Sequence, residues 1–361
     1  MKKNVIIFHL TDRGACSWVR FRFMAGLLET NTGGELIPVI SPWEVTEPDV
    51  LKRTAAIVVA RPMIGLHGEL LEHYKAKRAQ FGYKVFADYD DLLCDIDGKS
   101  PIPEYNRFKA SPFEIGKVME RHCSGLDGIT VASEYLARTL RRRFGWDNVT
   151  VVPNTVPRFA YGMAPRLSVE VDIEKPVVLY AGSMTHFKEG QLGDFEGPWV
   201  PWMRNAAETG EIELHCFGNS EPEFMTGVPV TVHPYVPAVA FPAAVAAIRP
   251  DIYLAPLLAN EFNRCKSDLK LLEAAAVGAV LLGSDFSGSP YADAAGLSRV
   301  GHDMTEEGLS YAVEAICQKE NFNAVLSHQR RLMETYGRYT ESRDSIMRFL
   351  SAYMGDAVSC V

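Results

Sequence analysis

The stretch that decides the fold is residues 259–286, ANEFNRCKSDLKLLEAAAVGAVLLGSDF. It predicts a helix with Ser267 or Asp268 as its N-cap and Gly278 at its end, followed at once by the apolar strand AVLLGS. Similar apolar runs and helical segments alternate along the rest of the chain. Alternation of this kind is typical of α/β domains with parallel sheets.

The start of this predicted helix is suited to binding phosphate. Its first turns carry Lys266 and Lys270, and Glu273 lies one turn deeper. A helix N-terminus offers free N–H groups and positive potential to an anion, and the lysines strengthen both. Glu273 could accept hydrogen bonds from ribose hydroxyls. A phosphate-binding helix start beside such a carboxylate suggests a nucleotide site. The alternative is an amphipathic helix whose lysines face water and whose glutamate is incidental.

A second segment about eighty residues earlier supports the nucleotide hypothesis. Residues 176–190, PVVLYAGSMTHFKEG, are a buried-type strand followed by Gly182, Ser183 and a loop with His186 and Lys188. Small residues at the carboxyl end of a strand let a ligand approach the backbone, and open α/β sheets bind their ligands at this edge.

The two segments together resemble the donor half of the GT-B glycosyltransferases, in the retaining branch that includes sucrose synthases. In that branch a Gly-Ser loop and a basic residue face the donor diphosphate, and the glutamate of an EAxAxG helix binds the ribose. Here EAAAVG begins at Glu273. DGITVASEYLARTL at 127–140 and VPNTV at 152–156 also resemble family segments. The resemblance implies an α/β chain of two Rossmann-like, doubly wound domains facing across a cleft.

The resemblance also implies a set of donor-binding residues, with one departure from the family pattern. The set is Gly14, Gly182, Ser183, His186, Lys188, Lys266, Ser267, Lys270 and Glu273. The family carries another glutamate eight positions before the ribose-binding one, but this chain has Cys265 there, with Glu261 nearby and out of register. We expect a UDP-sugar as donor, while the sugar itself stays open.

An acidic cluster marks the first half of the chain. Residues 84–96, KVFADYDDLLCDI, are a strand that ends in Asp88, Asp90 and Asp91. Three carboxylates this close repel one another unless a cation, a proton or a hydroxyl-bearing ligand relieves them. The cluster could be a metal site, an acceptor site or a solvated acidic turn. Because GT-B enzymes generally need no bound metal, the resemblance favours the acceptor site.

The N-terminal segment fits the same plan. An apolar strand at 4–10 precedes Gly14 and Arg20, which resemble the glycine and arginine of a compact bacterial and bacteriophage subgroup. We therefore expect Arg20, Asp88, Asp90 and Asp91 to bind the acceptor. No GxGxxG fingerprint is present, so nothing indicates a dinucleotide redox cofactor.

We expect three parts in the chain: an acceptor domain at 1–160, a donor domain at 161–330, and terminal helices at 331–361 that cross back to the first domain. Predicted strands of the first domain lie near 4–10, 36–40, 56–60, 84–88, 128–132 and 149–152. Those of the second lie near 176–181, 212–217, 229–232, 251–255 and 279–283.

Composition is that of an ordinary globular protein. Hydrophobic residues make up 47% and charged residues 23% of the chain, and no apolar run is long enough to span a membrane. The seven cysteines form no CxxC pair, which favours reduced thiols and a cytoplasmic location, in the host cell if a phage encodes the chain. Residues 1–160 hold 22 basic and 19 acidic residues, a weakly basic balance.

The predicted function is transfer of a sugar, hexosyl or pentosyl, from a nucleotide-sugar to a hydroxyl acceptor with retention. Asp90, Asp91 and Lys266 are the catalytic candidates, and no metal or other cofactor is expected. The acceptor is expected to be a glycan, with a hydroxymethylated DNA base as the second choice. Two alternatives stay open: a GT-B-like sugar-nucleotide epimerase, and a non-catalytic nucleotide-binding protein. The oligomeric state is not predicted.

Overall fold

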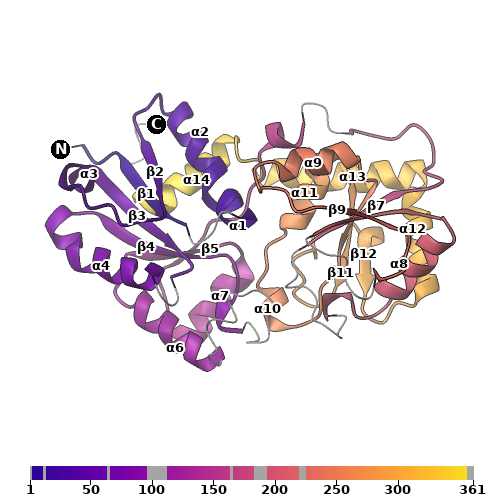
Figure 1. Ribbon diagram of the computed structural model, residues 1–361, viewed down its shortest axis with the longest axis horizontal. Helices are drawn as coiled ribbons and strands as arrows, with labels where there is room; N and C mark the ends of the chain where they lie inside the picture. The colour runs from indigo at the N-terminus through magenta and orange to yellow at the C-terminus, as the bar shows by residue number, and fades with distance from the viewer. Residues whose placement is uncertain are drawn as a thin grey trace.

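A computed structural model describes residues 2–10, 14–62, 66–95, 112–162, 166–182, 193–218 and 225–355. Two six-stranded parallel sheets, each flanked by helices, form two domains that lie side by side (Figure 1). The first sheet is complete at Val151, and the second begins at Val177. The predicted α/β architecture of two Rossmann-like domains is therefore confirmed.

The first sheet has the strand order β2-β1-β3-β4-β5-β6, with every neighbouring pair parallel. Its strands are β1 (Val5–His9), β2 (Ile37–Ser41), β3 (Thr54–Ala60), β4 (Lys84–Tyr89), β5 (Gly128–Val131) and β6 (Val149–Val151). Its helices are α1 (Ala15–Ser17), the π-helix η1 (Trp18–Arg22), α2 (Phe23–Asn31), α3 (Pro48–Arg53), α4 (Leu66–Phe81), α6 (Pro112–Cys123) and α7 (Glu134–Phe144). The strand order reverses between β1 and β3, so the crevice that binds ligands in such sheets opens at their carboxyl ends.

The second sheet is also parallel, with the order β12-β11-β10-β7-β8-β9, so its strand order reverses between β7 and β10. Its strands are β7 (Val177–Ala181), β8 (Glu213–Phe217), β9 (Val230–His233), β10 (Ile252–Ala255), β11 (Val280–Asp285) and β12 (Arg299–Gly301). Its helices are α8 (Trp199–Glu208), α9 (Phe241–Ile248), α10 (Glu261–Arg264), α11 (Leu269–Val277), α12 (Glu306–Cys317) and α13 (Lys319–Thr335). The sequence predicted every strand but β12, whose residues Arg-Val-Gly form no apolar run.

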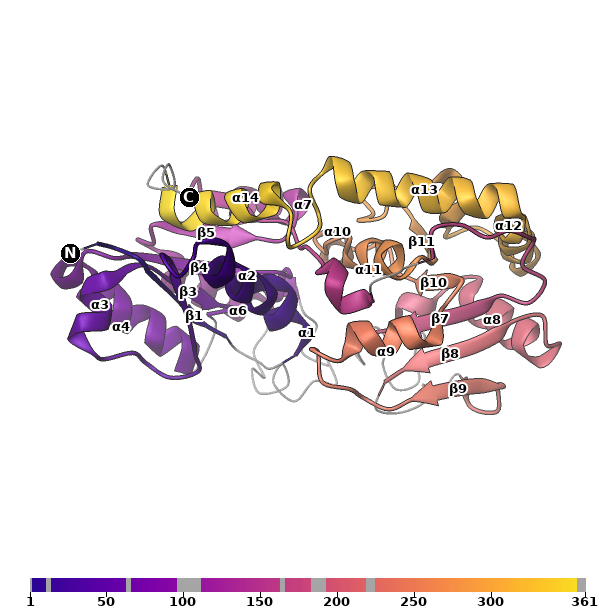
Figure 2. The same ribbon diagram turned by 90° about the horizontal axis from the view of Figure 1, so that it is seen from above.

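The chain returns to the first domain through its last helix, α14 (Arg343–Met354). Figure 2 shows α13 and α14 following one another along the same edge of the molecule, α13 over the second domain and α14 over the first. Phe349, Leu350 and Tyr353 of α14 are buried in one hydrophobic cluster with Phe8 of β1. No helix in the described part of the chain is long and apolar enough to cross a membrane.

The helix predicted from the opening stretch is α11, and its end is as expected. Gly278 caps it in the left-handed conformation, with φ of 80°. A Cβ at this position would lie 2.5 Å from the backbone oxygen of Arg166. Asp268 is the N-cap, but its side chain makes no capping hydrogen bond.

We expect Gly278→Ala to destabilise the protein more than Gly145→Ala does. Both glycines have positive φ, which costs an alanine about 1–2 kcal/mol. Only Gly278 adds a clash with backbone, since nothing lies within 4 Å of a Cβ at Gly145. The expected total at Gly278 is about 3 kcal/mol, measured by denaturant unfolding. Equal losses for the two variants would contradict this packing argument.

Candidate functional site

The candidate site lies where the carboxyl ends of β3 and β4 face the start of α11 across the boundary between the domains. The acidic cluster at the end of β4 supplies Asp88, Asp90 and Asp91 from the first domain. Asp88 pairs with Arg20 and Asp90 with Arg61, while Asp91 lies near both Arg61 and Lys266. The repulsion within the cluster is therefore relieved by three side chains, one of which belongs to the second domain.

Asp88 is held in a buried ion pair. The Arg20 guanidinium forms a bidentate pair with its carboxylate: Nε donates to Oδ2 at 3.1 Å and Nη2 donates to Oδ1 at 2.5 Å. Thr130 donates to the same carboxylate at 2.6 Å, and Arg20 also donates to the Val152 carbonyl and to Asn154. Only 2% of Asp88 and 5% of Arg20 are exposed. These two residues, predicted to bind the acceptor, therefore join the first sheet to the linker, the segment between β6 and β7 that begins at Val152.

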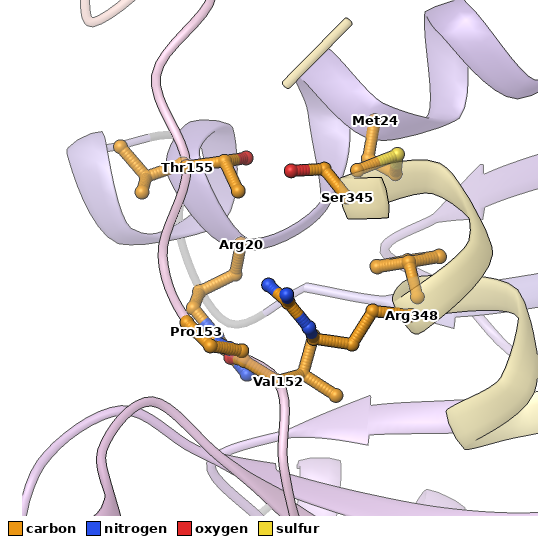
Figure 3. A pocket seen from close by; sticks show the side chains of 9 residues that line it. Arg20, Met24, Val152, Pro153, Thr155, Ser345 and Arg348 are labelled. Carbon is orange, nitrogen blue, oxygen red and sulfur yellow. The ribbon is translucent and has the colours of Figure 1, made fainter. Parts of the chain in front are cut away.

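Arg20 lies in the π-helix η1, a rare conformation that is frequent at functional sites. A water-sized hollow lies beside it, between η1, the linker and α14 (Figure 3). Pro153 and Thr155 line the hollow from the linker, and Ser345 and Arg348 line it from α14. It belongs to the joint between the domains and is too small for a sugar nucleotide.

Asp90 pairs with Arg61, a residue that the sequence analysis missed. Nε and Nη2 of Arg61 each donate to one carboxylate oxygen at 2.6 Å. Burial alone would raise the pKa of Asp90, but the charge and hydrogen bonds of Arg61 lower it to about 2. Asp90 is therefore a fixed negative charge at neutral pH and a poor proton acceptor.

Arg61 is positioned by the end of β3. Its backbone has a positive φ of 46°, unusual for a residue with a side chain, and its N–H donates to the Asp88 carbonyl at 2.8 Å. Its guanidinium also lies 3.0 Å from the Cys16 sulfur and 3.4 Å from Asp91. Residues with such unusual backbone dihedral angles are found most often at functional sites. An arginine directly after a buried strand was the signal available in the sequence.

Asp91 is the most open of the three carboxylates. Its side chain is 21% exposed, and one oxygen lies 4.0 Å from Nζ of Lys266, whose side chain is 17% exposed. The Lys266 ammonium also lies over the Phe262 ring, 4.7 Å from its centre. The structure thus brings the predicted acceptor carboxylate and the predicted donor lysine together from two domains.

Glu273, the expected ribose-binding residue, is buried on α11 with only 3% of its surface exposed. Its Oε2 accepts from the Tyr253 hydroxyl and from Lys270, both at 2.9 Å. Burial and the nearby Glu273 carboxylate raise the pKa of Tyr253 well above its ordinary value, so the hydroxyl stays a donor. Lys270 is held to its own helix in this arrangement, while Lys266 faces the other domain.

The remaining donor candidates lie at the predicted strand ends or outside the described residues. Gly182 directly follows β7, and Gly14 is the N-cap of α1. Ser183, His186 and Lys188 fall in the segment that the structure does not describe.

Cys265, which replaces the family glutamate, is fully buried against the core of the first domain. Ser133 at the start of α7 donates to the Cys265 carbonyl at 2.8 Å. Just before it, α10 lies against α7 (Figures 1 and 2), where Glu261 accepts from Arg142 at 2.6 Å. A carboxylate at position 265 would therefore face an apolar core.

Two further contacts fix α11 to the joint between the domains. Asn154 of the linker donates to Ser267 at 2.7 Å, and Arg338 pairs with Asp268 at 2.5 Å. Because Asn154 also accepts from Arg20, a continuous hydrogen-bonded path runs from Asp88 to Ser267. The start of α11 is thereby connected to the acidic cluster.

No protein-family model matches the sequence, and no curated protein matches it either. The fold, in contrast, is found in known structures. A glycosyltransferase from Rickettsia africae ESF-5 superposes with a TM-score of 0.59 at 10% identity, over 98% of both chains. WaaG, a glycosyltransferase involved in lipopolysaccharide biosynthesis, gives 0.59 at 15% identity, over 97% of this chain and 100% of its own. The chain has the GT-B fold.

A third similar structure contains a ligand. Anabaena Alr3699/HepE, solved in complex with UDP-glucose, superposes with a TM-score of 0.58 at 11% identity, over 96% of this chain and 99% of its own. At such identities the likeness establishes the architecture, while the chemistry depends on the residues of this chain.

We expect Asp88→Asn to destabilise the protein by about 3–5 kcal/mol, because it leaves the buried Arg20 charge without its partner. Asp91→Asn, the matched change three residues along, breaks a partly exposed pair and is expected to cost less than about 1 kcal/mol. Denaturant unfolding of both variants at pH 7 measures the difference. Similar losses would contradict the division into a structural and an open carboxylate.

Proposed function

We propose that the protein is a glycosyltransferase that moves a sugar from a nucleotide-sugar, first of all a UDP-sugar, to a hydroxyl acceptor with retention. The observation that carries the proposal is the approach of Lys266 to Asp91 across the domain boundary. A lysine at a helix start and an open carboxylate on the opposite domain are the two groups that a leaving diphosphate and an acceptor hydroxyl require.

The donor is proposed to bind the second domain. Lys266 and the start of α11, with Lys188 and the loop after Gly182, neutralise the diphosphate, and Glu273 binds the ribose. Departure of the nucleoside diphosphate concentrates negative charge on phosphate, so a cation placed there stabilises the transition state more than the ground state. The HepE structure with UDP-glucose supports a UDP-sugar as the first donor to test.

The acceptor is proposed to bind the first domain near Asp91. The ion pair of Asp90 and Arg61 lies beside this place, and its two charges balance each other. A glycan hydroxyl is the first candidate, and a hydroxymethylated DNA base is the second. A turnover screen over UDP-, GDP- and ADP-sugars, first with water and then with each acceptor class, tests the proposal. Nucleotide binding without any turnover would favour a non-catalytic protein, and turnover of the sugar without release of the nucleotide would favour an epimerase.

We expect Glu273→Ala to weaken UDP binding by about 1.5–3 kcal/mol, the usual contribution of a hydrogen bond to a charged group. Calorimetry on the folded variant measures the loss. Tyr253→Phe is the control, because it removes a partner of Glu273 and leaves the carboxylate in place. Unchanged UDP affinity in Glu273→Ala would remove this residue from the donor site.

We also expect turnover without a divalent cation, because Lys266, Lys188 and the helix start supply the positive charge that the diphosphate needs. Activity measured after exhaustive chelation should equal activity with added Mg²⁺ or Mn²⁺. Loss of activity on chelation, with recovery on adding Mn²⁺, would reassign Asp91 to metal binding.

A further inference from the structure

The carboxylate–cation pairs of the acidic cluster differ in how easily they can be broken. Arg20 and Arg61 each hold an aspartate with two hydrogen bonds, in pairs that are largely buried. A planar guanidinium fork fixes a carboxylate in this bidentate way, whereas a lysine is a point charge on a flexible stem. Lys266 and Asp91 make one contact at 4.0 Å, and both are partly exposed. The pair that joins the domains is therefore the loosest.

The same lysine has a second potential partner. Lys266 directly precedes Ser267 and lies just before α11, and the first N–H groups of a helix have no partner within the helix and favour anions. A nucleoside diphosphate carries more negative charge than one carboxylate, and it would also use those N–H groups. It therefore competes with Asp91 for Lys266.

We propose that Asp91 changes partners during the reaction cycle. It pairs with Lys266 in the empty protein, loses Lys266 to the donor diphosphate, and then accepts a hydrogen bond from the acceptor hydroxyl. This exchange rests on the proposed function and adds to it the partner that Lys266 has before the donor arrives. Asp88 and Asp90 do not exchange, because their guanidinium partners come from their own domain and stay bound.

The exchange has a cost that binding experiments can detect. In the empty protein Lys266 must leave Asp91 before it can bind phosphate, so the pair lowers donor affinity. Arg61 lies 3.4 Å from Asp91 and stays there after Lys266 has moved. Asp91 therefore keeps a cation nearby while it accepts a hydrogen bond from the acceptor hydroxyl.

A double-mutant cycle tests the exchange, with calorimetric UDP affinity as the readout. Asp91→Asn is expected to tighten UDP binding about two- to fivefold, the range for a partly exposed ion pair. In the Lys266→Met background the same substitution should change affinity less than about twofold. Asp147→Asn, which removes an exposed carboxylate from the first domain, is the control for net charge and should change nothing.

Three results would overturn the exchange. Unchanged UDP affinity in Asp91→Asn would show that the pair does not oppose the donor. Equal tightening with and without Lys266 would show that Asp91 repels phosphate directly and does not act through the lysine. Failure of UDP, GDP and ADP to bind the wild-type protein would remove the proposed function and the exchange together, whereas the first two results leave the donor site intact.

Discussion

The structure of the site depends on the neutralisation of three aspartates that follow one strand. Asp88, Asp90 and Asp91 would repel one another at the end of β4, in a partly buried place where water screens them weakly. Arg20 pairs with Asp88, Arg61 with Asp90 and Asp91, and Lys266 with Asp91. Because Lys266 comes from the second domain, the acidic cluster also links the two domains.

The three cations, Arg20, Arg61 and Lys266, connect the acidic cluster to different parts of the structure. Arg20 ties β4 to the linker, since it also donates to Val152 and Asn154. Arg61 keeps Asp90 ionised inside the first domain, with the pKa of that carboxyl lowered to about 2. Lys266 connects the acidic cluster to the start of α11. One charge cluster thus contributes to folding, to the contact between the domains and to the proposed chemistry.

Much of this architecture could be predicted from the sequence. Buried parallel strands are continuous apolar runs, and Gly278 marks the end of α11, so the alternation of elements and both sheets were evident. The short β12 carried too little pattern. The sequence predicted that two domains face each other, but it did not predict that Asp91 and Lys266 lie close together.

The partners of the acidic cluster could not be predicted, because they come from distant parts of the chain. Arg20 lies 68 residues from Asp88, and nothing local indicates that the two form a buried pair. Arg61 depends on an unusual backbone conformation that composition does not reveal. The burial of Cys265 in the other domain's core was equally hidden, although its replacement of the family glutamate was visible.

On the proposed exchange, Lys266 pairs with Asp91 in the empty protein and with the donor diphosphate in the complex. A crystal structure of the protein with UDP would show which partner Lys266 has. We expect Nζ of Lys266 within about 3 Å of a phosphate oxygen and farther from Asp91 than the present 4.0 Å, with the Arg61–Asp90 pair unchanged. UDP bound with Lys266 still on Asp91 and away from the phosphates would contradict it.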